Sequence, residues 1–146
     1  MKTVSENRRA RFDYEILETV EAGLLLTGQE VKSCRMGHLN LSGAYVSFLS
    51  GKPVLKNFTI SRYPFASKLE PYDEKRDRPL LLRAAEIRKL QAKAEEKGCS
   101  IIPLEVRAGK FVKLLLGVGH GRKKIDKRQR IREREVAQKL RKGEEI

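Results

Sequence analysis

The sequence has few of the residues from which catalytic and metal sites are built. It contains no tryptophan, two histidines and two cysteines, all widely scattered, so it predicts no zinc site. Cys34 and Cys99 are unrelated in spacing and are expected to be reduced thiols. Neither a carboxylate cluster nor a histidine-based acid–base pair is present. We therefore expect a protein that is not an enzyme and holds no metal or cofactor.

Long apolar runs are also lacking. None approaches the ~18–20 residues that a membrane-spanning helix needs. The first twelve residues, MKTVSENRRARF, lack the apolar core of a secretory signal. We therefore expect a cytoplasmic protein.

Acidic residues are outnumbered by basic ones. The chain has 19 Asp and Glu against 32 Lys and Arg, which gives a net charge of +13 and a pI near 10.0. This excess favours a polyanionic partner, either a nucleic acid or an anionic membrane surface. At 146 residues, 40% of them hydrophobic, the chain can form one domain with a modest core and tails.

The interpretation centres on residues 27–41, which read TGQEVKSCRMGHLNL. Thr27 and Glu30 form a T-x-x-E capping box, and Gly37 is a typical left-handed C-cap. A helix of about two turns is unstable alone, so it must be fixed on a larger core. It presents three candidate phosphate-binding side chains, Lys32, Arg35 and His38. Two interpretations stay open: a plug at one end of a barrel, or a rigid support for phosphate-binding cations.

A second long segment, residues 13–26, alternates between apolar and other residues and predicts a half-buried strand. Glu21 lies on the outward face of this strand. The sequence Glu21-Ala22-Gly23 predicts a bulge or sharp bend, because a glycine inside a strand is typical of one.

The rest of the chain predicts more strands and one further helix. Two pairs of segments read as hairpins: 44–49 with 53–60, and 100–107 with 111–118. Residues 61–79 form a loop that is too long for an ordinary connection. Residues 84–97 predict a helix that begins after Arg83, a poor N-cap. The glycine-rich residues 117–121 read as the exit from the last strand.

Five strands and two helices indicate a mainly β fold. We expect an OB-type small antiparallel Greek-key barrel with two or three short helices and a basic C-terminal tail. The predicted division is a basic N-terminal arm (1–11), an OB-type barrel (12–119) and the tail (120–146). The arm is either a frayed terminus or a phosphate-contacting segment.

The predicted tail has eleven basic and five acidic residues, a net charge of +6, and few apolar residues. Such a segment is expected to be disordered in the free protein and can become helical on a polyanion. A basic helix on a membrane surface is the alternative, but its apolar face would be thin.

Segments along nearly the whole chain resemble the SmpB (SsrA-binding protein) family. The most specific pattern is G-x-E-V-K-S-x-R-x-G followed at a distance by D-K-R. The matching segments are Asn7-Arg8-Arg9-Ala10, Glu21-Ala22-Gly23, Gly28-Gln29-Glu30-Val31-Lys32-Ser33, Arg35-Met36-Gly37, Asn40-Leu41, Tyr45-Val46, Leu80-Leu81-Leu82, Glu86-Ile87, Leu90, Gly121-Arg122-Lys123, Asp126-Lys127-Arg128 and Arg132-Glu133.

The resemblance implies a non-catalytic factor whose OB-type barrel binds the tRNA-like part of transfer-messenger RNA. It implies delivery of that RNA to stalled ribosomes for trans-translation, with small-subunit ribosomal RNA at the decoding site as a further partner. We expect no membrane partner and a monomer when free. The candidate RNA-binding residues are Arg8, Arg9, Glu21, Lys32, Arg35, His38, Asn40, Leu81 and Arg83. The candidate decoding-site and channel residues, in a tail that is helical on the ribosome, are Arg122, Lys123, Lys124, Asp126, Lys127, Arg128, Ile131 and Arg132.

Five positions depart from the family pattern. Arg83 stands where the family more often has Asn, and Pro79 and His38 stand where Lys is usual. Ile125 replaces an aromatic residue or histidine, and Val136 replaces a tryptophan found in several members. The tail of this chain therefore lacks side chains that stack on bases, while its charge remains.

A general single-strand nucleic-acid-binding OB protein is the alternative function. Such a protein needs several exposed aromatic residues as stacking platforms. Aromatic residues are only 6% of this chain, so this interpretation ranks second.

Overall fold

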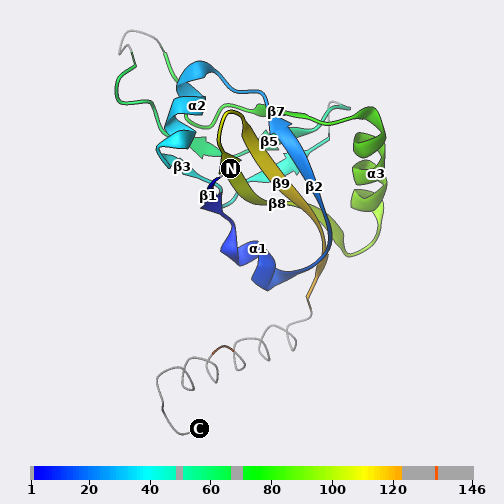
Figure 1. The fold of residues 1–146 in the computed structure, drawn as a ribbon. Coiled ribbons are helices and arrows are strands. Elements are labelled where there is room, and N and C mark those ends of the chain that lie inside the picture. Colours follow the sequence, from blue (N-terminus) through cyan, green and yellow to red (C-terminus); the bar gives the residue numbers. More distant parts are fainter. Residues whose placement is uncertain (1, 49–50, 67–70, 123–133, 135–146) are drawn as a thin grey trace, which may run out of the picture.

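The computed structural model describes residues 2–48, 51–66, 71–122 and 134, and Figure 1 shows their arrangement. The expected mainly β fold is confirmed, although these residues contain nine strands rather than five, and three helices. In chain order the elements are β1 (Lys2–Glu6), α1 (Arg8–Asp13), β2 (Tyr14–Leu24), α2 (Gly28–Arg35), β3 (Leu39–Asn40), β4 (Tyr45–Ser47), β5 (Val54–Lys56), β6 (Thr59–Ile60), β7 (Arg78–Leu81), α3 (Ala84–Glu95), β8 (Cys99–Ala108) and β9 (Val112–Gly121).

Seven of the strands form one antiparallel sheet in the order β1-β8-β9-β2-β7-β5-β4, and β3 pairs with β6 beside it. The strand β4 is last in this order, yet it contacts β8, which is second in it. The sheet therefore curls on itself as a small barrel does. The two long strands β2 and β9 form its front wall in Figure 1, with α2 near one end of β2 and α1 near the other.

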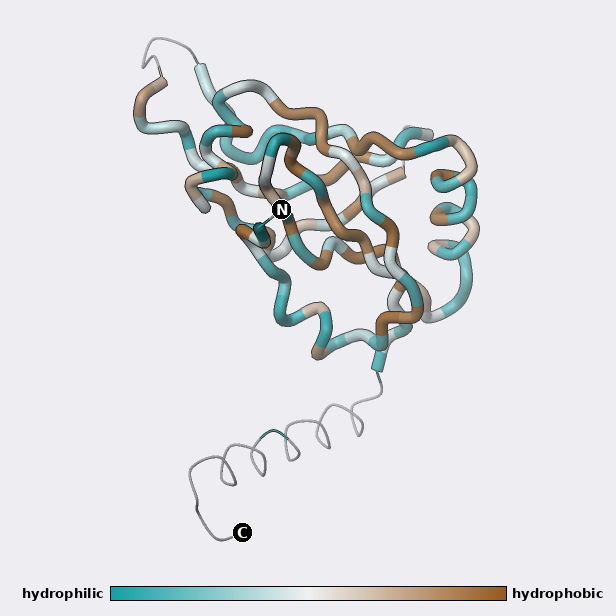
Figure 2. Tube along the Cα trace, in the orientation of Figure 1, coloured by the Kyte–Doolittle hydropathy of each residue, from teal (hydrophilic) through white to brown (hydrophobic). Residues whose placement is uncertain are grey.

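The core is built by the inward-facing residues of the long strands. Ala22 and Leu24 of β2 are buried, and so are Leu114, Leu116 and Val118 of β9. Figure 2 shows hydrophobic residues concentrated on these central strands and hydrophilic ones on the outer turns and helix faces. The alternation expected for β2 is therefore confirmed, with Glu21 exposed.

The bulge in β2 does not lie where the sequence predicts it. The register against β9 shifts between Ile16 and Glu18, not at Glu21-Ala22-Gly23. Gly23 has another role, because its Cα is paired with Leu81 of β7 and with Lys113 of β9. A Cβ at this position would lie 3.1 Å from the Leu81 Cβ, so the glycine lets β7 approach closely.

The glycine-rich segment 117–121 is part of β9 rather than the exit from it. A Cβ on Gly117 would lie 2.7 Å from Cδ1 of Leu104, and one on Gly119 would lie 2.5 Å from Cδ1 of Ile102. These glycines therefore leave room for large side chains of β8. The prediction of a strand exit was wrong because side-chain packing, not loop flexibility, requires the glycines.

The N-terminal residues are not a separate arm. Lys2–Glu6 pairs with β8, and Asn7 caps α1 by accepting a hydrogen bond from the backbone N–H of Ala10 at 3.2 Å. The Asn7 side chain also donates to the Pro103 carbonyl at 3.1 Å, and its backbone N–H donates to Leu104. The sheet therefore begins before residue 12, where the predicted barrel starts.

Three other predicted segments have different bounds in the structure. The expected strand 53–60 is two strands, because Asn57 has a left-handed φ of 57° that turns the chain between β5 and β6. The expected loop 61–79 ends two residues early, since Arg78 and Pro79 are already part of β7. The helix predicted for 84–97 ends at Glu95.

The capped helix α2 has the predicted ends. The Thr27 hydroxyl accepts from the Glu30 N–H at 3.3 Å, the Glu30 carboxylate accepts from the Thr27 N–H at 2.9 Å, and Gly37 has a φ of 77°. Glu30 does more than cap the helix. Its side chain is 1% exposed and its Oε2 accepts a 2.8 Å hydrogen bond from Nε of Arg78, which is 0% exposed.

Arg78 connects α2 to the rest of the barrel. Besides the Glu30 carboxylate, it donates to the carbonyls of Phe58 and Glu74. Arg76 adds a second ion pair to Glu30 from a more exposed position. Burial alone raises the pKa of Glu30, but the Thr27 N–H and the two arginines outweigh it, so the pKa lies below its ordinary value.

We predict that Glu30→Gln lowers the free energy of unfolding by about 3–5 kcal/mol at neutral pH, because it leaves the Arg78 charge buried without a counter-ion. Since the pKa of Glu30 is lowered by folding, its contribution is present above pH 4.5 and is lost as the pH falls through the folded value. The stability difference between the two proteins should therefore shrink below pH 4.5.

Urea denaturation at several pH values measures this. The matched control is Glu74→Gln, which removes an exposed carboxylate while keeping the carbonyl that Arg78 uses. An equal effect of both variants, or a difference that persists unchanged into acid, would contradict the prediction.

Candidate nucleic-acid interface

The outer face of the β2–β9–β7 wall brings two predicted RNA-binding residues together. Glu21 is exposed and its Cα is paired with Leu115 of β9. Two residues on, Gly23 is flanked by Leu81 on one side and Lys113 on the other. Because residues two apart in a strand share a face, Glu21 and Leu81 lie on one surface. Leu81 is 55% exposed, an unusual state for a large apolar side chain in a strand.

Arg83 lies at the edge of this same surface. It is exposed and precedes α3, where it has no side-chain capping bond. The Glu86 carboxylate accepts from the Arg83 N–H at 3.0 Å and so satisfies the helix start. The Arg83 side chain is thus not needed for capping and is exposed, two residues after Leu81.

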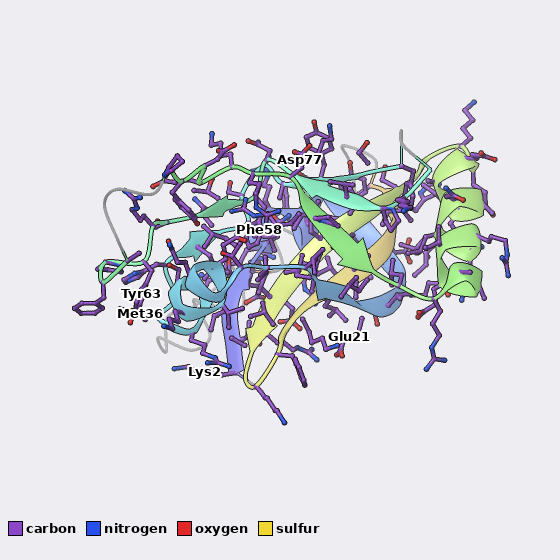
Figure 3. All side chains as sticks on the ribbon, turned by 90° about the horizontal axis from the view of Figure 1, so that it is seen from above. Lys2, Glu21, Met36, Phe58, Tyr63 and Asp77 are labelled. Atoms are coloured by element: carbon purple, nitrogen blue, oxygen red, sulfur yellow. The ribbon has the colours of Figure 1, made fainter. Side chains whose placement is uncertain are left out.

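A second predicted group surrounds α2, beyond the end of β2. Lys32 places its Nζ 5.4 Å from the Tyr63 ring centroid. Figure 3 places Tyr63 and Met36 at this same end of the molecule. His38 is exposed, while its N–H donates to the carbonyl of Ser33.

Two members of this group have structural partners. Arg35 donates from Nε to the Gly109 carbonyl and from Nη2 to the Lys110 carbonyl, both at 3.0 Å. Asn40 accepts from the Ser42 N–H at 2.9 Å and stabilises the turn after β3. Arg35 therefore fixes the β8–β9 turn against α2, a role that sequence analysis missed.

The arginines of α1 lie apart from α2. The eleven residues of β2 separate the two helices by roughly 35 Å of strand. Arg8 is exposed, and Arg9 pairs with Asp13 at 3.2 Å and packs 5.4 Å from the Phe12 ring centroid. The structure therefore does not join Arg8 and Arg9 to Lys32 and Arg35 in a single compact patch.

The predicted tail is mostly outside the described residues. Of its candidates, only Arg122 is described, and its N–H donates to the Asp13 carbonyl at 3.0 Å. The others lie outside the described residues: Lys123, Lys124, Asp126, Lys127, Arg128, Ile131 and Arg132.

Sequence analysis also missed residues of the outer wall. Lys113 and Leu115 are alternate residues of β9 and lie on the same face as Glu21. The strict alternation of residues 112–118 already indicated their outward direction. What it could not indicate was which residues of β2 and β7 stand beside them.

The thiol of Cys34 lies buried in α2. Burial, together with the charge of Glu30, raises the pKa of Cys34 to about 12, so this buried thiol stays protonated and unreactive. Among the described residues, no group of His, Cys, Asp and Glu side chains could hold a metal ion. Within the same residues, no helix is both long and apolar enough to cross a membrane.

Comparison with known proteins gives one consistent relationship. Residues 4–145 match the sequence model of the SmpB protein family. An SsrA-binding protein of Synechococcus sp. (strain JA-3-3Ab) is 46% identical over 141 residues, which cover 96% of this chain and 92% of that protein. An SsrA-binding protein of Coprothermobacter proteolyticus is 43% identical over 150 residues, which cover 100% and 99%.

A solved structure has a similar fold. Its description reads "tmRNA-SmpB: a journey to the center of the bacterial ribosome", and its matching chain has a TM-score of 0.66 and 44% sequence identity. The match covers 82% of this chain and 84% of that one. With a family match over nearly all residues, relatives above 40% identity and a shared fold, this chain belongs to the SmpB protein family.

Proposed function

We propose that this chain binds the tRNA-like part of transfer-messenger RNA and delivers it to stalled ribosomes for trans-translation. The observation that carries the proposal is the match along the whole chain to proteins that bind SsrA RNA. The outer wall supports it, because Glu21 and Leu81 are exposed on one face of the sheet and the exposed Arg83 follows Leu81 by two residues. The chain acts as a binding factor without catalysis, and its work on the ribosome places it in the cytoplasm.

The wall supplies shape and hydrogen-bonding specificity. A carboxylate such as Glu21 accepts hydrogen bonds from base amino groups or ribose hydroxyls, which a cation cannot do. Leu81 offers an apolar surface to a base or sugar, and Arg83 offers a charge to a phosphate. The cations around α2 add attraction for the RNA backbone that does not depend on sequence.

The tail supplies the contact with the ribosome. We infer that residues 120–146, and within them Asp126, Lys127 and Arg128, enter the decoding site and the empty messenger channel. The charge of this segment suits a path lined by ribosomal RNA.

RNA that copurifies with the protein separates this function from general single-strand binding. Sequencing that RNA should give one discrete species if the proposal is right. A heterogeneous mixture would favour the alternative OB protein.

We predict that Glu21→Ala weakens binding to the tRNA-like RNA on the order of ten-fold, as the loss of hydrogen bonds to a charged group implies. If Glu21 were only a surface charge, removing a negative charge would leave binding to a polyanion equal or tighter. The two hypotheses predict different changes in RNA affinity, weaker against equal or tighter, so a filter-binding titration distinguishes them.

The matched control is Glu15→Ala, which removes another exposed carboxylate of β2 outside the Glu21–Leu81 surface. This variant should bind with unchanged or slightly higher affinity. Thermal unfolding of both variants should match that of the unchanged protein, because neither side chain is buried.

We predict that the chain ending at Arg122 keeps cooperative unfolding and specific RNA binding but loses ribosome rescue. Arg122 is retained because β9 runs to Gly121 and the Arg122 N–H bonds to Asp13. Some sequence-independent affinity should be lost with the charge of the tail. The measurements are a tagging assay on stalled ribosomes and a binding assay with transfer-messenger RNA.

Within the full chain, Lys127→Ala with Arg128→Ala should reproduce most of the rescue defect. Lys139→Ala with Arg141→Ala removes the same charge and should do less harm. Tagging by the truncated chain, or equal defects in the two double variants, would show that this division of roles is wrong.

A further inference from the structure

The turn between β8 and β9 exposes an aromatic ring among lysines. Phe111 is 61% exposed, although most large apolar residues of the neighbouring strands face the core. The ammonium groups of Lys110 and Lys113 lie 5.8 Å and 5.9 Å from the centroid of its ring. Lys2, whose Cα is paired with Ala108, lies beside the same turn in Figure 3.

This ring stands on a turn that is held in place. The Gly109 N–H donates to the Phe111 carbonyl at 3.1 Å and closes the turn. From outside it, Arg35 binds the carbonyls of Gly109 and Lys110. Since α2 is itself fixed by the buried Glu30–Arg78 pair, the turn is braced against the core. A ring held in this way loses little conformational freedom when a ligand stacks on it.

The ring also continues the surface that carries Glu21. Lys113 and Leu115 are alternate residues of β9, and Phe111 precedes them in the turn with its ring centroid 5.9 Å from the Lys113 Nζ. Lys113 is in turn paired with Gly23, the residue that flanks Leu81. Figure 3 places Glu21 and the β8–β9 turn on the same side of the molecule. The aromatic ring is thus one end of the outer wall rather than an isolated surface residue.

We propose that Phe111 is a stacking platform for an unpaired base of the bound RNA, with Lys110 and Lys113 contacting the phosphates on either side of it. The proposal rests on the RNA-binding function above. A ring flanked by two cations suits a nucleotide, which presents a flat base and an anionic backbone together. The contacts of the exposed ammonium groups with the ring are weaker than base stacking, so the lysines can turn to the phosphates. An apolar protein partner would gain nothing from the two lysines.

The absence of tryptophan allows a direct test. Phe111→Trp creates the sole tryptophan of the chain, so its fluorescence reports on this site alone. We expect strong quenching when the tRNA-like RNA is added, with affinity retained. The control is Tyr45→Trp, at a position that is 52% exposed on β4, away from the outer wall, and it should show little quenching. Equal quenching at both positions would overturn the proposal.

Affinity provides a second readout. Phe111→Leu keeps an apolar side chain without a stacking face and should weaken binding on the order of ten-fold, whereas Phe111→Tyr should bind as the unchanged protein does. Replacing both Lys110 and Lys113 by Gln should lower the slope of log affinity against log salt by about 1.4, as two lost phosphate contacts on a single strand predict.

Different results would contradict the proposed function and the proposed stacking role of Phe111. If the unchanged chain does not bind the tRNA-like RNA, the proposed function is wrong. If it binds and Phe111→Leu binds equally well with an unchanged melting temperature, only the stacking platform is wrong.

Discussion

The buried ion pair between Glu30 and Arg78 is the constraint on which the binding surface depends. Removing two charges from water is costly, and the cost is offset only if nearly every polar atom finds a partner. Here the carboxylate also caps α2, and the guanidinium binds carbonyls of two other segments. A short helix that could not exist alone is thereby tied to β7 and to the loop that precedes it. Through Arg35, the same helix holds the β8–β9 turn.

Local sequence signals predicted those parts of the fold that depend on local interactions. The T-x-x-E box identified α2 and its first residue, because capping is decided within one helical turn. Alternation identified β2, β8 and β9, and it also gave the outward direction of Glu21. The helix packs on the core through Cys34 and carries the exposed Lys32, and its role as a support for phosphate-binding cations stays a prediction.

The parts that the sequence could not predict depend on distant partners. Arg78 lies among mixed charges in a proline-containing segment and reads as solvated, because nothing local indicates that Glu30, 48 residues away, will accept its hydrogen bond. The strand Lys2–Glu6 is short and polar, and only its pairing with β8 makes it a strand. In the same way, the sequence around Gly23 predicts a bulge, because nothing local indicates that Leu81 will pack against this glycine. That Glu21 and Leu81 share one face, which the proposed site needs, could therefore come only from the resemblance or the fold.

The proposed interface offers a physical answer to how a protein of charge +13 can select one RNA. Cations attract every nucleic acid, so selectivity must come from groups whose contribution depends on geometry. The Glu21 carboxylate repels a phosphate and forms a favourable hydrogen bond only with a donor group in the correct position. Leu81 and Phe111 gain from contact with a base or sugar and gain nothing from a charged backbone. In the proposed interface Lys113 is paired with Gly23, between Leu81 and the turn that carries Phe111, so a cation that attracts any RNA lies beside groups that favour only a correctly placed one.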